Sequence, residues 1–226
     1  MKASMPGRKP AQGVFVTGTD TDVGKTLVSV ILASAWGADY WKPFQTGVAV
    51  AQGDTETVAS LLGTGSHVLH PPASVLRAPL APWAAAREEG VTLDVAALCL
   101  PATDKALVVE GAGGLYVPLD DERMMIDLAR QLALPVVLVA RSTLGTINHT
   151  LLSLHAMRAR GLPVLGVVMN GPLSPGNCEA LERFGQVQII AQIPPLKCVD
   201  ADAVADVASR IPPLASLLSK AGLGGG

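Results

Sequence analysis

The stretch that decides the fold is Val14-Phe15-Val16-Thr17-Gly18-Thr19-Asp20-Thr21-Asp22-Val23-Gly24-Lys25-Thr26. Its first residues are apolar and β-branched or aromatic, which predicts a buried strand. The loop that follows is rich in Gly, Thr and Asp, and it ends in Gly-Lys-Thr where an apolar helical pattern begins. In such an arrangement the N–H groups of the loop and of the helix N-terminus point toward an anion. The stretch therefore predicts a phosphate-binding loop.

The register of this loop departs from the usual G-x4-G-K-[ST] pattern. Thr19 stands where the first glycine is expected, and Gly18 lies one residue earlier. The alternative is an ordinary strand-to-helix turn with a surface lysine. We favour nucleoside triphosphate binding because a strand precedes the loop and an apolar helix follows it. Lys25 can then reach the β- and γ-phosphates, and the Thr26 hydroxyl can hold Mg²⁺.

Composition predicts one globular domain. The chain has 226 residues, of which 49% are hydrophobic and 16% charged, enough apolar residues for a full core. The net charge of −2 gives no general attraction to nucleic acid or to an anionic membrane, so we expect neither as a partner. We predict a single α/β domain over residues 13–221, between a flexible extension at 1–12 and a flexible Gly-rich tail at 222–226.

Cysteine usage and the N-terminus predict a cytoplasmic protein. Cys99, Cys178 and Cys198 are odd in number and far apart, which predicts neither a disulfide framework nor a metal site. Residues 1–13 are basic but lack the apolar core of a secretory signal.

Apolar runs alternate with helical patterns along the chain. This alternation predicts an α/β fold with a mostly parallel sheet flanked by helices on both faces. The strands are expected at 13–17, 40–43, 106–110, 136–140, 165–169 and 187–191. The helices are expected at 25–36, 54–62, 93–100, 125–132, 146–160, 177–183 and 202–218, the last interrupted near Pro212-Pro213.

Polar or glycine-bearing segments follow five of these strands. In open parallel sheets, ligands bind at the carboxyl ends of the strands, so these segments are expected to meet at one edge. They are residues 17–24, 42–47, 110–114, 170–171 and 192–196.

Two acidic residues and one lysine are candidates for the chemistry. Glu110 ends a buried strand and precedes Gly111-Ala112-Gly113-Gly114; it can reach Mg²⁺ or simply cap a tight turn, and the presence of Lys25-Thr26 favours the metal. Asp54 is a second Mg²⁺ carboxylate or the N-cap of the following helix, and both roles remain open. Lys42 can stabilise charge on a phosphoryl group or carboxylate, or it is a solvated lysine.

Two further segments suggest ligand contacts. Gly145-Thr146-Ile147-Asn148 begins a helix whose free N–H groups can take a carboxylate, the alternative being ordinary capping by Thr146. Asn170 offers a donor and an acceptor that suit an adenine edge, or it is a polar turn residue before Gly171.

Together these segments resemble the dethiobiotin synthetases, a family of the P-loop NTPase superfamily. The resemblance covers about residues 13 to 200. It is carried by the strings VTGTDTDVGKT, WKPFQTG, VEGAGG and GTINH, and by Asn170 and Ile193-Pro194, in the family's order. The displaced glycine of the loop is itself a trait of that family.

The resemblance implies a homodimeric, ATP- and Mg²⁺-dependent ligase. Its substrates would be 7,8-diaminopelargonic acid and CO2 or bicarbonate, joined through a carbamate and a carbamic-phosphoric anhydride into a cyclic urea. The accumulating negative charge would be met by two lysines, a metal and helix N-termini.

The resemblance also implies roles for individual residues. The catalytic lysines would be Lys42 and Lys25, and Mg²⁺ would be held by Thr26, Asp54 and Glu110. The diamine would contact Thr46 and, across the dimer interface, Gly145, Thr146, Ile147 and Asn148. ATP would contact Asp22, Val23, Gly24, Lys25, Thr26, Leu27, Asp54, Glu110, Gly111, Ala112, Gly113, Asn170, Gly171, Pro194, Pro195 and Leu196.

The sequence departs from the family pattern in two places. Asp22 replaces a glutamate that the family often has, and Val199-Asp200-Ala201 stands where a ribose-contacting glutamate can occur.

Two other classes of protein share parts of the pattern. Switch-type ATPases of partitioning or septum positioning usually carry an additional lysine early in the loop, where this chain has Thr19-Asp20-Thr21. Amidoligases of corrinoid synthesis share the loop and the EGAG-like turn, but they are longer and carry a glutaminase domain.

Overall fold

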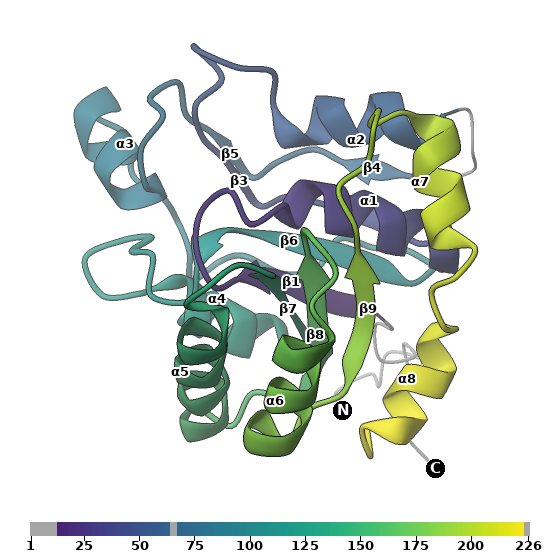
Figure 1. The fold of residues 1–226 in the computed structure, drawn as a ribbon. Helices are drawn as coiled ribbons and strands as arrows, with labels where there is room; N and C mark the ends of the chain where they lie inside the picture. Colours follow the sequence, from purple (N-terminus) through teal and green to yellow (C-terminus); the bar gives the residue numbers. More distant parts are fainter. Residues whose placement is uncertain (1–12, 64–66, 224–226) are drawn as a thin grey trace, which may run out of the picture.

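Seven parallel strands form the central sheet of the computed structural model, which describes residues 13–63 and 67–223. Their order is β4-β2-β6-β1-β7-β8-β9, so the strand that precedes the phosphate-binding loop lies in the middle of the sheet (Figure 1). The strands are β1 (Gly13–Gly18), β2 (Asp39–Trp41), β4 (Leu69–His70), β6 (Leu107–Gly114), β7 (Val136–Arg141), β8 (Val164–Asn170) and β9 (Ile189–Ile193). A separate small sheet pairs β3 (Phe44–Gln45) with β5 (Ser74–Val75).

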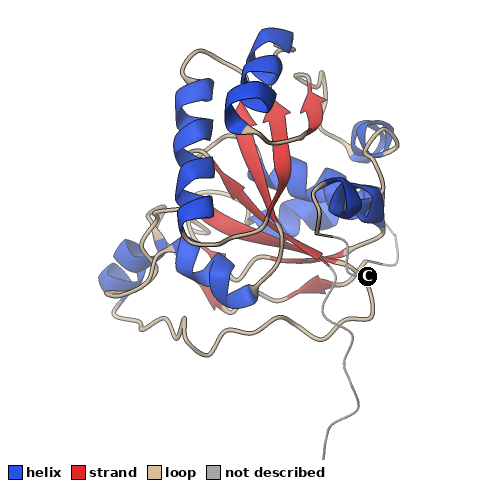
Figure 2. Cartoon of the chain, turned by 90° about the horizontal axis from the view of Figure 1, so that it is seen from below, coloured by secondary structure: helices blue, strands red, loops and turns tan. Residues whose placement is uncertain are grey.

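Helices cover both faces of the sheet, as Figure 2 shows from below, and this confirms the predicted α/β class. One face packs against α1 (Lys25–Trp36), α2 (Asp54–Leu62), α7 (Ala201–Ala208) and α8 (Leu214–Lys220). The other face packs against α3 (Pro82–Glu89), α4 (Met125–Leu132), α5 (Thr146–Ala159) and α6 (Pro175–Gly185).

The alternation of side chains along β1 explains the two cores. Val14 and Val16 point to the α1 face, and Phe15 points to the α4 face. All three are fully buried, because successive side chains of a strand point to opposite faces and both faces here are covered. Burial on both faces of the sheet explains why Val14, Phe15 and Val16 are all apolar.

Several predicted helices agree closely with the structure. Three have the expected bounds, and α5 ends one residue earlier than expected. The helix expected at 177–183 is longer and begins at Pro175. The interruption near Pro212-Pro213 is confirmed, because it separates α7 from α8.

The helix predicted at 93–100 is wrong. The segment forms turns, in which the Asp94 carboxylate accepts a hydrogen bond from the N–H of Ala97 and the N–H of Leu98 donates to the carbonyl of Val95. Gln131 from α4 donates to three carbonyls of this segment. Local turn bonds and the tertiary bonds from Gln131 therefore replace the helical ones, while Leu93 and Val95 still enter the core.

Helix α3 and the short strands β3, β4 and β5 were not predicted from the sequence. The helix carried a readable signal, because Pro82 stands in its first turn and Gly90 ends it in the left-handed conformation at φ 66°. Strand β9 is shifted two residues from its predicted place, which brings Ile193 opposite Asn170 of β8. The strand expected at 106–110 runs on to Gly114 as β6, so the alternative of a tight turn capped by Glu110 is wrong.

The C-terminal helix ends in a Schellman motif. The N–H of Gly222 donates to Ser219, and the N–H of Leu223 donates to Leu218. Gly222 and Leu223 complete this motif, whereas residues 1–12 of the predicted extension and 224–226 of the predicted tail lie outside the described residues. Within the described ranges, no helix has both the length and the apolar character needed to cross a bilayer.

Candidate active site

The loop between β1 and α1 forms a compact turn over the start of the helix. Gly24 is the N-cap of α1 at φ 89°, and a Cβ there would lie only 2.1 Å from the side-chain nitrogen of Asn170. Asp22 also has a left-handed backbone, at φ 56°. The Lys25 ammonium turns back along the loop and donates to the carbonyl of Asp20 at 3.1 Å. Because the first N–H groups of a helix lack intrahelical partners, this turn presents donors suited to phosphate.

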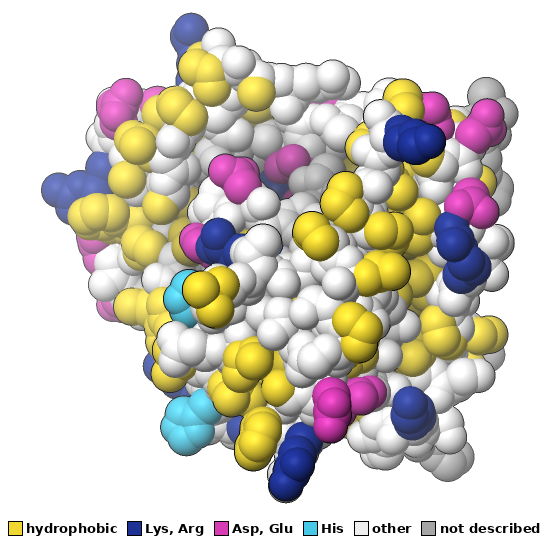
Figure 3. All heavy atoms as spheres, viewed as in Figure 1, with side chains coloured by type: hydrophobic (Ala, Val, Ile, Leu, Met, Phe, Trp, Pro, Cys, Tyr) yellow, Lys and Arg dark blue, Asp and Glu magenta, His cyan; other side chains and the backbone are white. Residues whose placement is uncertain are grey.

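Four predicted residues meet beside the start of α1. The Thr26 hydroxyl lies 2.7 Å from Oδ1 of Asp54 and 2.9 Å from Oε1 of Glu110. Nζ of Lys42 lies 2.6 Å from Oδ2 of Asp54 and 3.0 Å from Oε1 of Glu110. Thr26 and Glu110 are 84 positions apart in the chain and yet lie together. We call the group of Thr26, Lys42, Asp54 and Glu110 the Lys42 cluster. The surface is hollowed between α2 and the loop that precedes α1, and charged side chains line that hollow (Figure 3).

The fold explains how these side chains meet. Lys42 follows β2 directly, Glu110 lies on the adjacent strand β6, and Thr26 is the second residue of α1. Asp54 is the first residue of α2, whose N-cap is Gly53. The capping interpretation of Asp54 is therefore wrong, since its carboxylate binds Lys42 and Thr26 instead. Lys42 is 5% exposed, so the solvated-lysine alternative is wrong as well.

Burial and charge set the protonation of the cluster. Burial alone would lower the pKa of Lys42, but the Glu110 and Asp54 carboxylates together raise it above its ordinary value. Burial alone would raise the pKa of Asp54, but Lys42 and the Thr26 hydroxyl hold it below its ordinary value. The pKa of Lys25 is lowered, because burial outweighs the attraction of Glu110. Lys42 is therefore a fixed cation and Asp54 a fixed anion near neutral pH.

Three residues at this edge were not predicted as site residues. The buried Tyr40 hydroxyl donates to Oε2 of Glu110 at 2.9 Å, and burial followed by the Glu110 charge raises the pKa of Tyr40 well above its ordinary value. Gln45 accepts a hydrogen bond from the N–H of Asp54. Arg141 pairs with Asp20 of the loop. Gln45 lies inside the string WKPFQTG, whereas the sequence carried no signal for Tyr40 or Arg141, because their partners are distant in the chain.

The segments expected to bind the base lie next to one another. Asn170 pairs with Ile193 in the sheet, and the N–H of Gly171 donates to the carbonyl of Ile193. Pro194, Pro195 and Leu196 follow directly. The Asn170 amide also donates to the carbonyl of Val23 at 2.9 Å, so it ties β8 to the phosphate-binding loop.

The remaining predicted residues occupy distinct places. Gly111 and Ala112 are buried in β6, and Gly113 follows at φ 66°. Leu27 is half-buried against the α1-side core, and Thr46 follows β3 directly. Asp200 caps α7 by accepting from the N–H of Ala203.

Helix α5 contributes to a cavity rather than to the Lys42 cluster. The cavity has a volume of about 300 Å³ and is lined by residues 18–21 of the loop, residues 114–117, and Leu152, Ser153 and Ala156 of α5. Gly145, Thr146, Ile147 and Asn148 do not line it. Gly145 is the N-cap at φ 94°, and the Thr146 hydroxyl lies by Thr150, so the capping interpretation of Thr146 is wrong.

The oxygen atoms of the Lys42 cluster suit a magnesium ion. The Thr26 hydroxyl has one proton for Oδ1 of Asp54 and Oε1 of Glu110, so three oxygen atoms converge there, and Lys42 is the second donor to Oε1. Within residues 13–63 and 67–223, no three His, Cys, Asp or Glu side chains group closely enough to hold a metal by themselves. Mg²⁺ commonly takes one or two carboxylates together with phosphate oxygens and water, and this set fits that preference.

Comparison with known proteins gives clear relatives. The family described as AAA domain matches residues 12–203. The chain is 55% identical over 194 residues to the ATP-dependent dethiobiotin synthetase BioD of Paramagnetospirillum magneticum, which covers 86% of this chain and 93% of that protein. It is also 61% identical over 212 residues to the biotin biosynthesis bifunctional protein BioCD of Bordetella avium, covering 94% of this chain but 45% of that protein. The chain thus spans about half the length of the bifunctional relative.

A solved structure supports the fold. A putative plasmid partition protein of Borrelia burgdorferi bound to AMPPNP aligns with a TM-score of 0.57 and 10% identity, over 94% of this chain and 99% of that one. At such low identity, the likeness extends to the fold alone. The high identity to BioD over nearly its whole length decides the family: this chain belongs to the ATP-dependent dethiobiotin synthetases, which are ligases.

Proposed function

We propose that the chain forms the cyclic ureido ring of dethiobiotin from 7,8-diaminononanoate, which is 7,8-diaminopelargonic acid, with CO2 and ATP. The observation that carries the proposal is the Lys42 cluster beside the start of α1. It holds a permanently charged lysine and two carboxylates next to a phosphate-binding loop. A reaction between anionic partners needs such fixed charges.

The reaction is a sequence of two attacks and a ring closure. An amine of the diamine adds to CO2 and, after losing a proton, leaves a carbamate. A carbamate oxygen then attacks the γ-phosphorus of ATP, and ADP leaves. The second amine attacks the carbamate carbon and expels phosphate, which closes the ring.

The lysines have separate roles in this proposal. Lys25 is the first residue of α1 and binds the β- and γ-phosphates. Lys42 lies against Asp54 and Glu110 and stabilises the charge on the carbamate and on the transferring phosphoryl group. Fixed donors of this kind stabilise a transition state without having to reorganise.

Thr26, Asp54 and Glu110 would hold Mg²⁺ together with the phosphates. The ion supplies neutralisation of the phosphate charge. The convergence of both carboxylates on one hydroxyl supports this assignment.

Nucleotide contacts would extend from the loop to β8 and β9. Residues 22–27 would surround the phosphates, and Gly111, Ala112 and Gly113 would approach the nucleotide and the substrate. The base would lie against Asn170 and Gly171 on one side and Pro194, Pro195 and Leu196 on the other. The sheet pairing of Asn170 with Ile193 supports this pocket.

The diamine would contact Thr46, and its distal carboxylate would meet residues 145–148 of a second copy. Two observations support a homodimer: residues 145–148 lie outside the cavity beside their own loop, and Leu144 and Leu152 are 103% and 61% exposed. We also place the protein in the cytoplasm, because its three cysteines are free.

The direct test is to incubate the protein with ATP, Mg²⁺, the diamine and ¹³C-bicarbonate, and to detect dethiobiotin by mass spectrometry. We expect a product one mass unit heavier than with ordinary bicarbonate, formed with one ADP per ring. The Lys25→Ala variant should give no product. ATP hydrolysis that ignores the diamine would reject the proposal in favour of a switch-type ATPase.

A further inference from the structure

Gln45 makes two hydrogen bonds that join separate parts of the site. Its side chain is buried, with 5% of the residue exposed, on the short strand β3. Oε1 accepts from the N–H of Asp54 at 2.8 Å, and Nε2 donates to the carbonyl of Thr46 at 2.9 Å. The amide therefore meets a donor with its oxygen and an acceptor with its nitrogen.

The bond to Asp54 substitutes for a missing helix cap. The N-cap of α2 is Gly53, which has no side chain to accept from the first N–H groups of the helix. Gln45, nine residues earlier, supplies that acceptor. Since Asp54 is the first residue of α2, this bond fixes the backbone from which its carboxylate reaches Lys42 and Thr26.

Close packing restricts the same junction. A Cβ at Gly53 would lie 3.4 Å from Cδ of Gln45 and 2.1 Å from a carboxylate oxygen of Glu56. A side chain at position 53 would therefore collide with Glu56 and contact the Gln45 amide, so the glycine at the N-cap leaves the amide free to reach the N–H of Asp54.

The hydrogen bond to Thr46 holds the segment that carries Lys42. Lys42 and Gln45 belong to one short segment, which pairs with β5 through Phe44 and Gln45 rather than with the main sheet. Nε2 of Gln45 holds the carbonyl of Thr46 at the end of this segment. One amide therefore sets the spacing between Asp54 on α2 and the segment that carries Lys42 and Thr46.

We propose that Gln45 is a positioning residue for the reaction. Its oxygen orients Asp54 toward the ATP-bound magnesium, and its nitrogen orients Thr46 toward the diamine. The role of Gln45 in orienting Thr46 rests on the proposed function, because it concerns the diamine. The role of Gln45 in orienting Asp54 concerns only Mg²⁺-dependent nucleotide binding.

Two variants separate the two hydrogen bonds. Gln45→Met keeps the length of the side chain and removes both bonds. Gln45→Glu keeps an acceptor for the N–H of Asp54, but an ionised carboxylate cannot donate to the carbonyl of Thr46.

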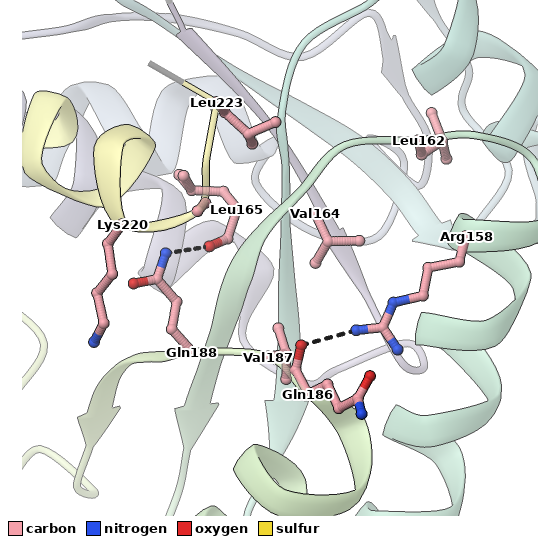
Figure 4. A pocket seen from close by; sticks show the side chains of 10 residues that line it. Arg158, Leu162, Val164, Leu165, Gln186, Val187, Gln188, Lys220 and Leu223 are labelled. Carbon is pink, nitrogen blue, oxygen red and sulfur yellow. Dashed lines mark hydrogen bonds between the residues drawn. The ribbon is translucent and has the colours of Figure 1, made fainter.

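Gln188→Met is a matched control. Nε2 of Gln188 donates to the carbonyls of Leu165 and Leu217, beside a pocket at the opposite edge of the sheet. Figure 4 shows this side chain with Arg158 and Lys220 around the same pocket. The control removes an amide of the same kind where no site residue is affected.

The main readout is the ratio of ADP affinities measured by calorimetry with Mg²⁺ and with EDTA. Gln45→Met should lower this ratio about tenfold while the affinity in EDTA stays within about twofold, in line with other residues that support metal ligands. It should also lower kcat by about 10- to 100-fold. Gln45→Glu should not lower the ratio, because it keeps the acceptor and adds a negative charge beside the cluster, and it should raise KM for the diamine.

A purely structural role predicts a different result. Gln45→Met would then lower the melting temperature, as Gln188→Met should. The Mg²⁺ ratio, kcat and KM of the folded enzyme would stay unchanged, and that result overturns the proposal. If Gln45→Met does not fold, Gln45→Glu decides, and a wild-type diamine KM rejects the Thr46 role. Should the wild-type protein make no dethiobiotin, the Mg²⁺ ratio still tests the Asp54 role.

Discussion

At the scale of single residues, one lysine compensates two carboxylates. Lys42 lies between Asp54 and Glu110 and is almost fully buried. Removing one partner from a buried ion pair leaves a charge without compensation, which is costly to stability. The lysine therefore contributes to stability as well as to the proposed chemistry.

We predict that Lys42→Met lowers kcat at least about 100-fold, because a preorganised charge at the transferring group is lost. The affinity for ATP should change by less than about threefold, because the lysine forms its ion pairs with Asp54 and Glu110 rather than with the loop. Steady-state kinetics and equilibrium binding measure the two quantities. Lys25→Met is the comparison and should lose nucleotide binding itself. An unchanged kcat in Lys42→Met would remove this lysine from the mechanism.

The lowered pKa of Asp54 gives a pH prediction. A carboxyl with a lowered folded pKa contributes stability that is present above its ordinary value of 3.8 and is lost as the pH falls through the folded value. Asp54→Asn cannot titrate. The difference in unfolding free energy between wild type and Asp54→Asn should therefore shrink as the pH falls from about 5 to about 2.5. Urea unfolding across this range measures it, and a constant difference would contradict the assigned ion pair.

At the scale of elements, the start of α1 depends on Gly24. Its left-handed backbone lets the loop turn into the helix, and the absence of a Cβ leaves room for Asn170 to reach the carbonyl of Val23. One glycine thus joins the phosphate-binding loop to β8.

We predict that Gly24→Ala weakens ATP binding at least about tenfold. The left-handed backbone costs a residue with a Cβ roughly 1–2 kcal/mol, and the new Cβ would also displace Asn170. Gly90→Ala is the matched control, with φ 66° and no atom within 4 Å of an added Cβ. It should lower the unfolding free energy by a similar backbone cost and leave ATP affinity unchanged. Equal effects of the two variants on ATP affinity would show that the contact with Asn170 is irrelevant.

At the scale of the whole molecule, apolar side chains remain on the surface beside the cavity at the loop. Leu152 lines that cavity and Leu144 precedes α5, and both are exposed. A second copy that covered them would bring the α5 start of one chain toward the site of the other, as the proposed diamine contacts require.

We predict that Leu152→Glu shifts the protein from dimer to monomer and raises KM for the diamine, because a charge enters an apolar interface. Sedimentation velocity measures the first effect, and kinetics measures the second. Phe184→Glu is the control, since Phe184 is similarly exposed on α6 and should leave both unchanged. A wild-type monomer would reject the dimer.

The site could be predicted from the sequence where local pattern and strand order sufficed. The deciding stretch gave β1, the loop and α1 with nearly correct bounds. Polar residues after parallel strands must share one sheet edge, so Lys42, Glu110 and Asn170 were identified without coordinates. The helix at 93–100 was wrong because its apolar spacing suits a helix, while Gln131, 36 positions from Val95, supplies hydrogen bonds that a local pattern cannot show.

By itself, the sequence determined the α/β class, the phosphate-binding loop and the residue types at the site, because these depend on apolar periodicity and glycine placement over short stretches. Only the tertiary structure showed that the Asp54 carboxylate pairs with Lys42, that Tyr40 donates to Glu110, and that Gln45 accepts from the backbone N–H of Asp54. Those contacts join residues far apart in the chain. Their geometry follows from strand order, helix starts and burial, which a linear pattern does not contain.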